Sequence, residues 1–133
     1  MNQPAAQPAT LPVLLIEDEV GVMAYVRATL ERSGYAVACA QSGAEGIRML
    51  ETGNFLGVVS DMVTPGGVNG AGVHAWIARN RPDLASRIVF ITGDIANEET
   101  VATLRRTGAP CVEKPFRVQQ FIDVVEKTIG KAP

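Results

Sequence analysis

At residues 58–66 the chain reads VVSDMVTPG, a short apolar run that ends at Asp61 and is followed by a turn-forming proline and glycine. Short apolar runs bounded by turn signals are typical of strands that are buried on both faces of a parallel sheet. Open α/β folds place their chemistry just outside the carboxyl ends of such strands. We therefore expect Asp61 on the functional edge of a sheet.

Three further apolar runs end in polar side chains in the same way: residues 13–16 before Glu17 and Asp18, residues 88–91 before Thr92, and residues 111–112 before Glu113 and Lys114. In a parallel sheet these side chains would meet Asp61 at one edge. Close carboxylates repel one another unless a cation holds them, and a few hard oxygen ligands suit Mg²⁺. The hydroxyl and the ammonium would bind the other oxygens of a phosphoryl group.

Strands alternate with amphipathic helices along the rest of the chain. Strands are expected at residues 13–16, 35–40, 56–60, 88–91 and 109–113, and a helix follows each of them. The first helix is expected at residues 19–33, with Glu19 interpreted as its acidic start. The fourth is expected at residues 97–106, with Val101 and Leu104 facing inward. Such alternation predicts an α/β, flavodoxin-like, doubly wound parallel sheet of five βα units, in the strand order 2-1-3-4-5.

Composition limits the function classes. The chain has 133 residues, of which 47% are hydrophobic and 20% charged, with a formal net charge of −2. These values fit one globular domain and give no basic footprint for nucleic acid. No apolar run approaches the ~20 residues that cross a membrane. Residues 1–10 lack a secretory h-region and are interpreted as a flexible tail or linker remnant, followed by a domain at 11–130 and a tail at 131–133.

The two cysteines, Cys39 and Cys111, fall in the expected second and fifth strands. In the predicted strand order these are opposite edges of the sheet, four spacings or ~19 Å apart. A disulfide needs Cα atoms within ~7 Å of each other. Both thiols are therefore expected to be reduced, which favours a cytoplasmic location.

The chain resembles the receiver domain of two-component response regulators over about residues 11–130. The motifs that match are these: Glu17-Asp18 as the acidic pair, Asp61 with Pro65 four residues later, Thr92-Gly93, and Lys114-Pro115-Phe116. Each motif alone is weak, but their order at four successive strand ends is specific. The loop after Asp61 is one residue longer than the commonest form. This longer loop is similar to that of receivers in hybrid sensor kinases.

The resemblance implies that Asp61 accepts a phosphoryl group from a phosphohistidine on a sensor histidine kinase or a histidine phosphotransfer protein. It implies that Mg²⁺ is held by Glu17, Asp18, Asp61 and the carbonyl of Val63. It implies that phosphoryl oxygens are bound by Thr92, Lys114 and the backbone amides of Met62 and Gly93. The signal would leave through a downstream protein partner, with no nucleic-acid or membrane contact within this chain.

Two further features follow from the resemblance. The peptide bond before Pro115 is expected to be cis, which would aim the Lys114 ammonium at Asp61. Thr92 and the residue three positions before Lys114 would form a switch region. That residue is Cys111 here, where the family usually carries Tyr or Phe.

Other functions are also compatible with an aspartate at a strand end. The resemblance implies a receiver domain that is not a conventional enzyme, although it promotes its own phosphorylation and dephosphorylation. One alternative is a degenerate receiver that only binds proteins. Another is a Mg²⁺-dependent phosphatase, which expects a second Asp two residues after the nucleophile, where this chain has Val63. A flavodoxin expects a hydroxyl-rich loop after the first strand, where this chain has acids.

Overall fold

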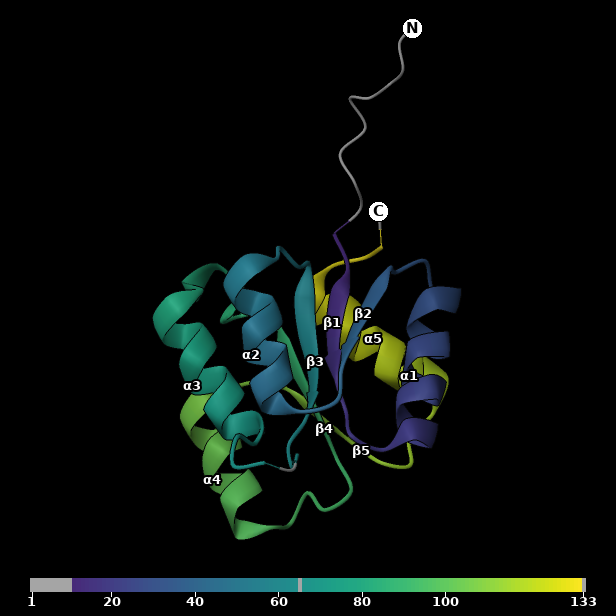
Figure 1. Ribbon diagram of the computed structural model, residues 1–133. Helices are drawn as coiled ribbons and strands as arrows, with labels where there is room; N and C mark the ends of the chain where they lie inside the picture. The colour runs from purple at the N-terminus through teal and green to yellow at the C-terminus, as the bar shows by residue number, and fades with distance from the viewer. Residues whose placement is uncertain (1–10, 65, 133) are drawn as a thin grey trace, which may run out of the picture.

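Within the described residues, five strands form one parallel sheet in the order β2-β1-β3-β4-β5, as predicted (Figure 1). The computed structural model describes residues 11–64 and 66–132. The predicted tail at 1–10, Pro65 of the expected acceptor loop and the last tail residue, Pro133, lie outside this range. The strands are β1 (Val13–Ile16), β2 (Val37–Ala40), β3 (Gly57–Asp61), β4 (Ile88–Thr92) and β5 (Cys111–Glu113).

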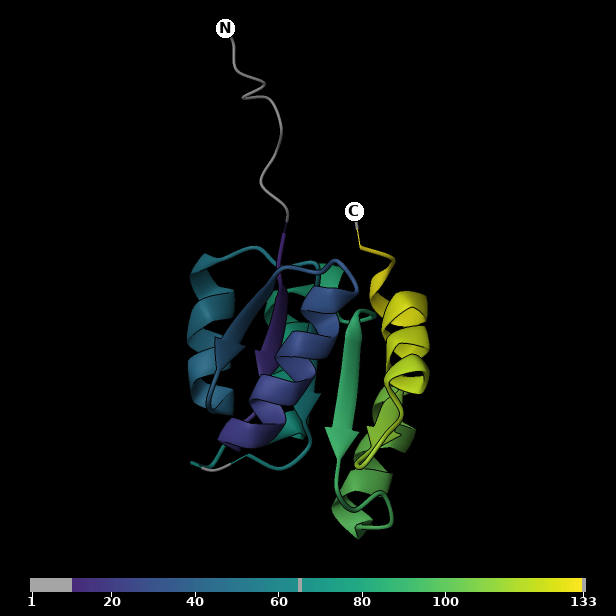
Figure 2. The same ribbon diagram turned by 90° about the vertical axis from the view of Figure 1, so that its right-hand side faces the viewer.

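Helices cover both faces of the sheet, which confirms the doubly wound α/β fold (Figures 1 and 2). The helices are α1 (Val20–Arg32), α2 (Gly43–Thr52), α3 (Gly70–Asn80), α4 (Glu98–Thr107) and α5 (Val118–Ile129), with a 3₁₀ turn, η2, at Pro82–Leu84. One apolar cluster joins α1 and α5 to the sheet. The second cluster joins α2 and α3 to its other face.

The central strands contribute to both clusters because successive side chains of a strand point to opposite faces. Val13 and Leu15 of β1 lie in the first cluster, and Leu14 and Ile16 lie in the second. Every residue of β1, β3 and β4 is buried, whereas most of β2 is only half-buried. The most apolar strands are therefore central, and their carboxyl ends form a rigid edge for the site.

Side-chain caps fix where three helices begin. Ser42 accepts a hydrogen bond from the Glu45 amide at 3.1 Å, and Asn69 accepts one from the Gly72 amide at 2.9 Å. Asn97 accepts from two amides of the first turn of α4. These side chains satisfy amides that have no partner within the helix, so the sequence itself positions the starts of α2, α3 and α4.

The buried face of α4 differs in part from the prediction. Leu104 is partly buried and packs against the second apolar cluster, as predicted, whereas Val101 is only partly buried and the fully buried residues of this helix are Thr100 and Thr103. The helix begins at Glu98, after the Asn97 cap. The Thr103 hydroxyl donates to the Glu99 carbonyl at 2.9 Å, which lets a polar residue occupy a buried position.

The strand edges also differ in detail from the prediction. The last strand begins at Cys111, so Pro110 precedes it, and the Pro110 carbonyl accepts a hydrogen bond from the Phe90 amide at 2.9 Å. Cys39 and Cys111 lie in opposite edge strands, and both are free thiols. Among the described residues, no helix combines the length and the apolar character that crossing a membrane requires.

Candidate functional site

The carboxyl ends of four strands open into one pocket. β1 ends just before Glu17, β3 ends at Asp61, β4 ends at Thr92, and Lys114 follows β5. The pocket has a volume of about 370 Å³ and is lined by Asp18, Glu19, Asp61, Val63, Thr92, Gly93, Asp94, Asn97, Thr100 and Lys114. The polar side chains that the sequence places at separate strand ends thus lie at one edge of the sheet.

Two of the carboxylates are deeply placed. Glu17 is 0% exposed and Asp61 is 5% exposed. Together with Glu19 they form a group in which one carboxylate oxygen of each residue lies within 4.8 Å of the others. Such a group of oxygen atoms is able to hold a hard divalent cation.

Glu19 in this group is a departure from the interpretation of this residue as only the start of α1. Its side chain makes no capping hydrogen bond, and its backbone is extended. The Glu19 amide donates to Glu17 Oε2 at 3.1 Å. In an extended chain the side chains of residues i and i+2 lie on the same face. The side chains of Glu17 and Glu19 therefore lie on the same side of this segment. Asp18 is exposed on the rim, although it lines the same pocket.

Lys114 is the cation at the centre of the acids. Its Nζ lies 3.2 Å from Asp61 Oδ2, 3.4 Å from Glu17 Oε1 and 3.9 Å from Glu19 Oε1. The Lys114 amide donates to the Thr92 carbonyl at 2.7 Å, which ties this segment to the end of β4. The Lys114–Pro115 peptide bond is cis.

The pKa values of Lys114 and Glu17 are shifted by their surroundings. Burial opposes the charge on Lys114, but attraction to Asp61 and Glu17 outweighs it and raises the pKa of the ammonium. Burial raises the pKa of Glu17, against the hydrogen bond that Glu19 donates to it. Three carboxylates facing one ammonium leave a net negative site, which favours an additional cation.

The amides next to Asp61 do not all point at the site. The Met62 amide donates to the Ile91 carbonyl at 2.8 Å, as part of the contact between the ends of β3 and β4. This bond directs the Met62 amide at β4 and not into the pocket, which argues against its expected role in binding a phosphoryl oxygen. The next amide, of Val63, donates to Asp61 Oδ1 at 3.2 Å and faces the pocket instead.

Gly70 allows α3 to begin close to the acceptor strand. Its amide donates to the Met62 carbonyl at 2.9 Å. A Cβ atom at this position would lie 2.9 Å from the Asp61 carbonyl oxygen and from the Met62 Cα. A larger residue would therefore have to shift the backbone that carries Asp61.

The two residues of the expected switch region lie on neighbouring strands. Thr92 is 2% exposed, and its hydroxyl accepts from the Asp94 amide at 3.1 Å. Cys111 is half-buried and pairs with Phe90 in the ladder between β4 and β5. Burial, and then the charges of Asp61 and Glu113, raise the pKa of Cys111 to about 11.

Sequence comparison identifies the family to which a chain with this fold and this acidic edge belongs. Residues 13–126 match the model of the response regulator receiver domain. The chain therefore belongs to the response regulator receiver domain family. It is a receiver domain of two-component signalling, with an acidic pocket formed by Glu17, Glu19 and Asp61.

Relatives agree with this assignment. The chain is 27% identical to the response regulator receiver protein CpdR of Brucella abortus (strain 2308) over 117 residues, which cover 88% of this chain and 95% of that protein. A CheY-like receiver domain protein from Methanospirillum hungatei JF-1 has a similar structure, with a TM-score of 0.80, 20% identity and coverage of 91% of this chain and 94% of the other.

A second similar structure is that of the response regulator protein TrrA from Thermotoga maritima, in complex with Mg(2+)-BeF. It gives a TM-score of 0.74 at 22% identity and covers 89% of this chain and 98% of its own. Receiver domains are signalling domains and are generally not enzymes. They interact with histidine kinases or phosphotransfer proteins, and they bind Mg²⁺ at acidic residues.

Proposed function

We propose that Asp61 accepts a phosphoryl group from the phosphohistidine of a sensor histidine kinase or a histidine phosphotransfer protein. The observation that carries this proposal is the ammonium of Lys114, 3.2 Å from Asp61 Oδ2 at the end of β3. A carboxylate serves as a phosphoryl acceptor when nearby cations offset the charge of the incoming group. Lys114 is one such cation, and its position beside Asp61 is fixed by β5.

The donor set of the pocket fits Mg²⁺. Glu17, Asp18 and Asp61 with the Val63 carbonyl would hold the ion, and the grouping of Glu17, Glu19 and Asp61 adds Glu19 as a further oxygen donor. A bound divalent cation would offset the negative charge of the phosphoryl oxygens and of the carboxylates. The net negative charge of the acidic group supports this part of the proposal, as does the Mg(2+)-BeF complex of the similar Thermotoga maritima protein.

In the transfer step, one Asp61 carboxylate oxygen forms a bond to phosphorus while the bond from phosphorus to the imidazole nitrogen breaks. The imidazole leaves with that electron pair. Lys114 and the Thr92 hydroxyl would bind the phosphoryl oxygens, together with the amides of Val63 and Gly93, which line the same pocket. The protein contributes positioning and charge, which is the main requirement of phosphoryl transfer.

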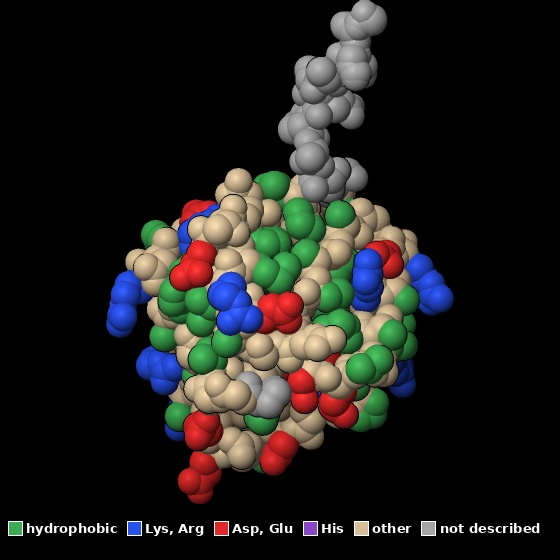
Figure 3. Space-filling view, viewed as in Figure 1, with side chains coloured by type: hydrophobic (Ala, Val, Ile, Leu, Met, Phe, Trp, Pro, Cys, Tyr) green, Lys and Arg blue, Asp and Glu red, His purple; other side chains and the backbone are tan. Residues whose placement is uncertain are grey.

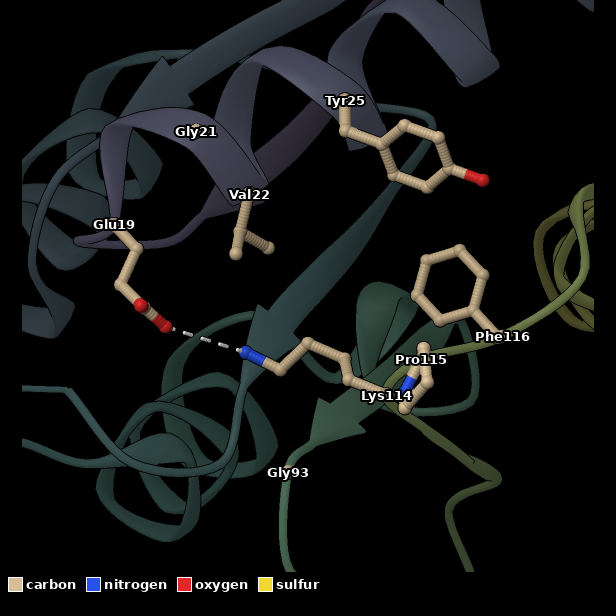
Figure 4. A pocket seen from close by; sticks show the side chains of 8 residues that line it. All are labelled: Glu19, Gly21, Val22, Tyr25, Gly93, Lys114, Pro115 and Phe116. Atoms are coloured by element: carbon tan, nitrogen blue, oxygen red, sulfur yellow. Dashed lines mark ion pairs between the residues drawn. The ribbon is translucent and has the colours of Figure 1, made fainter.

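An apolar hollow beside the site supports a protein as the phosphoryl donor. It has a volume of about 520 Å³ and is lined by Glu19, Gly21, Val22, Tyr25, Gly93, Lys114, Pro115 and Phe116 (Figure 4). Tyr25 of α1, which lines this hollow with Val22, Pro115 and Phe116, is 48% exposed. Exposed apolar side chains that gather at one place favour a protein contact, and here that contact would bring a partner's imidazole to the pocket.

Replacing the acceptor tests the proposal. Asp61→Asn removes the nucleophilic oxygen and keeps the shape of the side chain, so labelling by a small phosphodonor with Mg²⁺ should be lost. Phosphorylation is measured by intact-protein mass spectrometry, and circular dichroism checks the fold. Asp123→Asn, an exposed change on α5, should label as well as the unchanged protein.

Two results would contradict this proposal. Equal labelling of Asp61→Asn would show that another residue is the acceptor. If the unchanged protein were not labelled, a degenerate receiver that only binds proteins would be favoured. The phosphatase alternative expects a general acid two residues after Asp61. Val63 stands there and is 65% exposed, and turnover of a phosphate monoester would be needed to revive that alternative.

A further inference from the structure

A second hollow lies away from Asp61, between α3 and α4. It has a volume of about 480 Å³ and is lined by His74, Ala75, Ala78, Arg79, Arg106 and Thr107. A smaller hollow of about 360 Å³ shares His74 and Thr107 and is also lined by Ala85, Ser86, Ile88, Gly108, Ala109 and Pro110. The two hollows lie next to each other, since His74 and Thr107 line both, and they are together called here the α3–α4 groove.

The charge of the α3–α4 groove is of one sign. Arg79 and Arg106 are exposed, and neither forms an ion pair with any residue that the structure describes. No Asp or Glu among the described residues lines either hollow, although acids outnumber bases in the chain by 14 to 12. Figure 3 shows Lys and Arg side chains at the edge beside α3, and Asp and Glu side chains farther down, at the end of the molecule where α4 begins.

The side chains that line the α3–α4 groove are mostly small. Four alanines line the groove, and the half-buried His74 ring lies with its centroid 6.2 Å from that of Phe90. Burial and the nearby Arg106 lower the pKa of His74, so at neutral pH the ring is uncharged and the arginines carry the positive charge. Small side chains leave space for a peptide backbone, with Arg79 and Arg106 on two different helices within reach of its carboxylates.

We propose that the α3–α4 groove binds an acidic segment of a partner protein, rich in Asp or Glu. This is a second surface, separate from the phosphoryl site, and it does not depend on the function proposed for Asp61. Nucleic acid fits less well, because it requires a broad basic footprint. Here the positive charge is local, because Arg79 and Arg106 are the only Lys or Arg side chains among the described residues that line the two hollows.

The test uses the full chain and a fluorescent peptide of alternating Asp and Ala, with binding followed by anisotropy. The double variant Arg79→Ala/Arg106→Ala should weaken binding roughly tenfold, the effect of losing two exposed ion pairs. Arg48→Ala, on the exposed side of α2 outside the groove, is the matched control and should bind as the unchanged protein does. A peptide of Asn and Ala should bind far more weakly, and added salt should weaken binding of the acidic peptide.

Amide shifts on titration should gather at His74, Arg79, Arg106 and Thr107. Asp61→Asn should bind the peptide normally, which keeps this test separate from that of the phosphoryl site. The proposal is overturned if the acidic peptide does not bind at millimolar concentration, or if the double variant and Arg48→Ala behave alike. It is also overturned if inorganic phosphate binds as tightly at the same residues, which would make the groove a small-anion site, or if duplex DNA binds more tightly than the peptide.

Discussion

At the scale of single residues, Cys111 is where this receiver departs most from the pattern that it resembles. The thiol stands where an aromatic ring is usual, beside β4 and within the field of Asp61. A thiol has far less packing area than a ring, so turning inward gains it little. The surroundings of Cys111 nevertheless affect its titration, because burial raises the pKa of the thiol from 9.0 to about 11.

Because of Cys111, the free energy of unfolding should fall in alkaline solution. Above pH 9 the unfolded chain loses the thiol proton while the folded chain keeps it, so stability falls between pH 9 and pH 11. We expect Cys111→Ser, whose hydroxyl does not titrate in this range, to remove ~1 kcal/mol of that loss. Urea unfolding of both proteins at pH 8 and pH 10.5 measures the difference. Identical losses in the two proteins would mean that the folded-state thiol is not protected.

At the scale of elements, α4 is the helix whose packing the sequence predicted least well. Hydrophobic periodicity predicted Val101 and Leu104 inward; Leu104 does pack against the core, but the residues that the helix buries fully are Thr100 and Thr103. The hydroxyl of Thr103 is satisfied by the carbonyl four residues earlier, which periodicity of apolar residues does not register. With polar residues on its buried face, α4 depends more than other helices on its ends.

The cap of α4 should therefore matter for stability. Asn97 accepts from the Glu99 amide at 3.0 Å and from the Thr100 amide at 3.1 Å, so Asn97→Ala leaves both donors without this partner. We expect a loss of about 1 kcal/mol in the free energy of unfolding, measured by urea denaturation, and faster amide exchange in the first turn of α4.

Asn80→Ala provides the control for this prediction. Asn80 is exposed at the end of α3 and donates only to the Trp76 carbonyl, at 3.0 Å. We expect its effect to stay within about 0.5 kcal/mol. If the two variants were equally stable, the α4 cap would not be a significant source of stability.

At the scale of the whole molecule, the alternation of strands and helices was sufficient to predict the sheet order and the edge on which the polar groups meet. Strand ends converge in any parallel sheet, so Asp61, Thr92 and Lys114 could be placed together without coordinates. The conformation of the local turns could not be predicted from the sequence. Glu19 joins the acids because extended backbone puts it on the same side as Glu17, and the Met62 amide is taken by Ile91.

Mg²⁺ should stabilise the whole fold, because an ion that binds only the folded chain shifts the unfolding equilibrium. At ten times its dissociation constant the gain would be ~1.4 kcal/mol, seen as a higher urea midpoint that disappears when EDTA is added. Asp18→Asn should reduce the gain by removing a charge from the pocket rim. Glu51→Gln, an exposed change on α2, should leave the gain unchanged.

Glu17→Gln gives the sharpest form of this prediction. Glu17 is fully buried, and burial opposes its charge, while Lys114 keeps Asp61 and Glu19 as partners when Glu17 is neutral. In EDTA we therefore expect the variant to be at least as stable as the unchanged protein, because carboxylate repulsion is relieved. With Mg²⁺ added, the order should reverse, because only the unchanged protein retains the full set of oxygen ligands. A variant that gains as much from Mg²⁺ as the unchanged protein would show that the ion binds away from the Glu17 carboxylate.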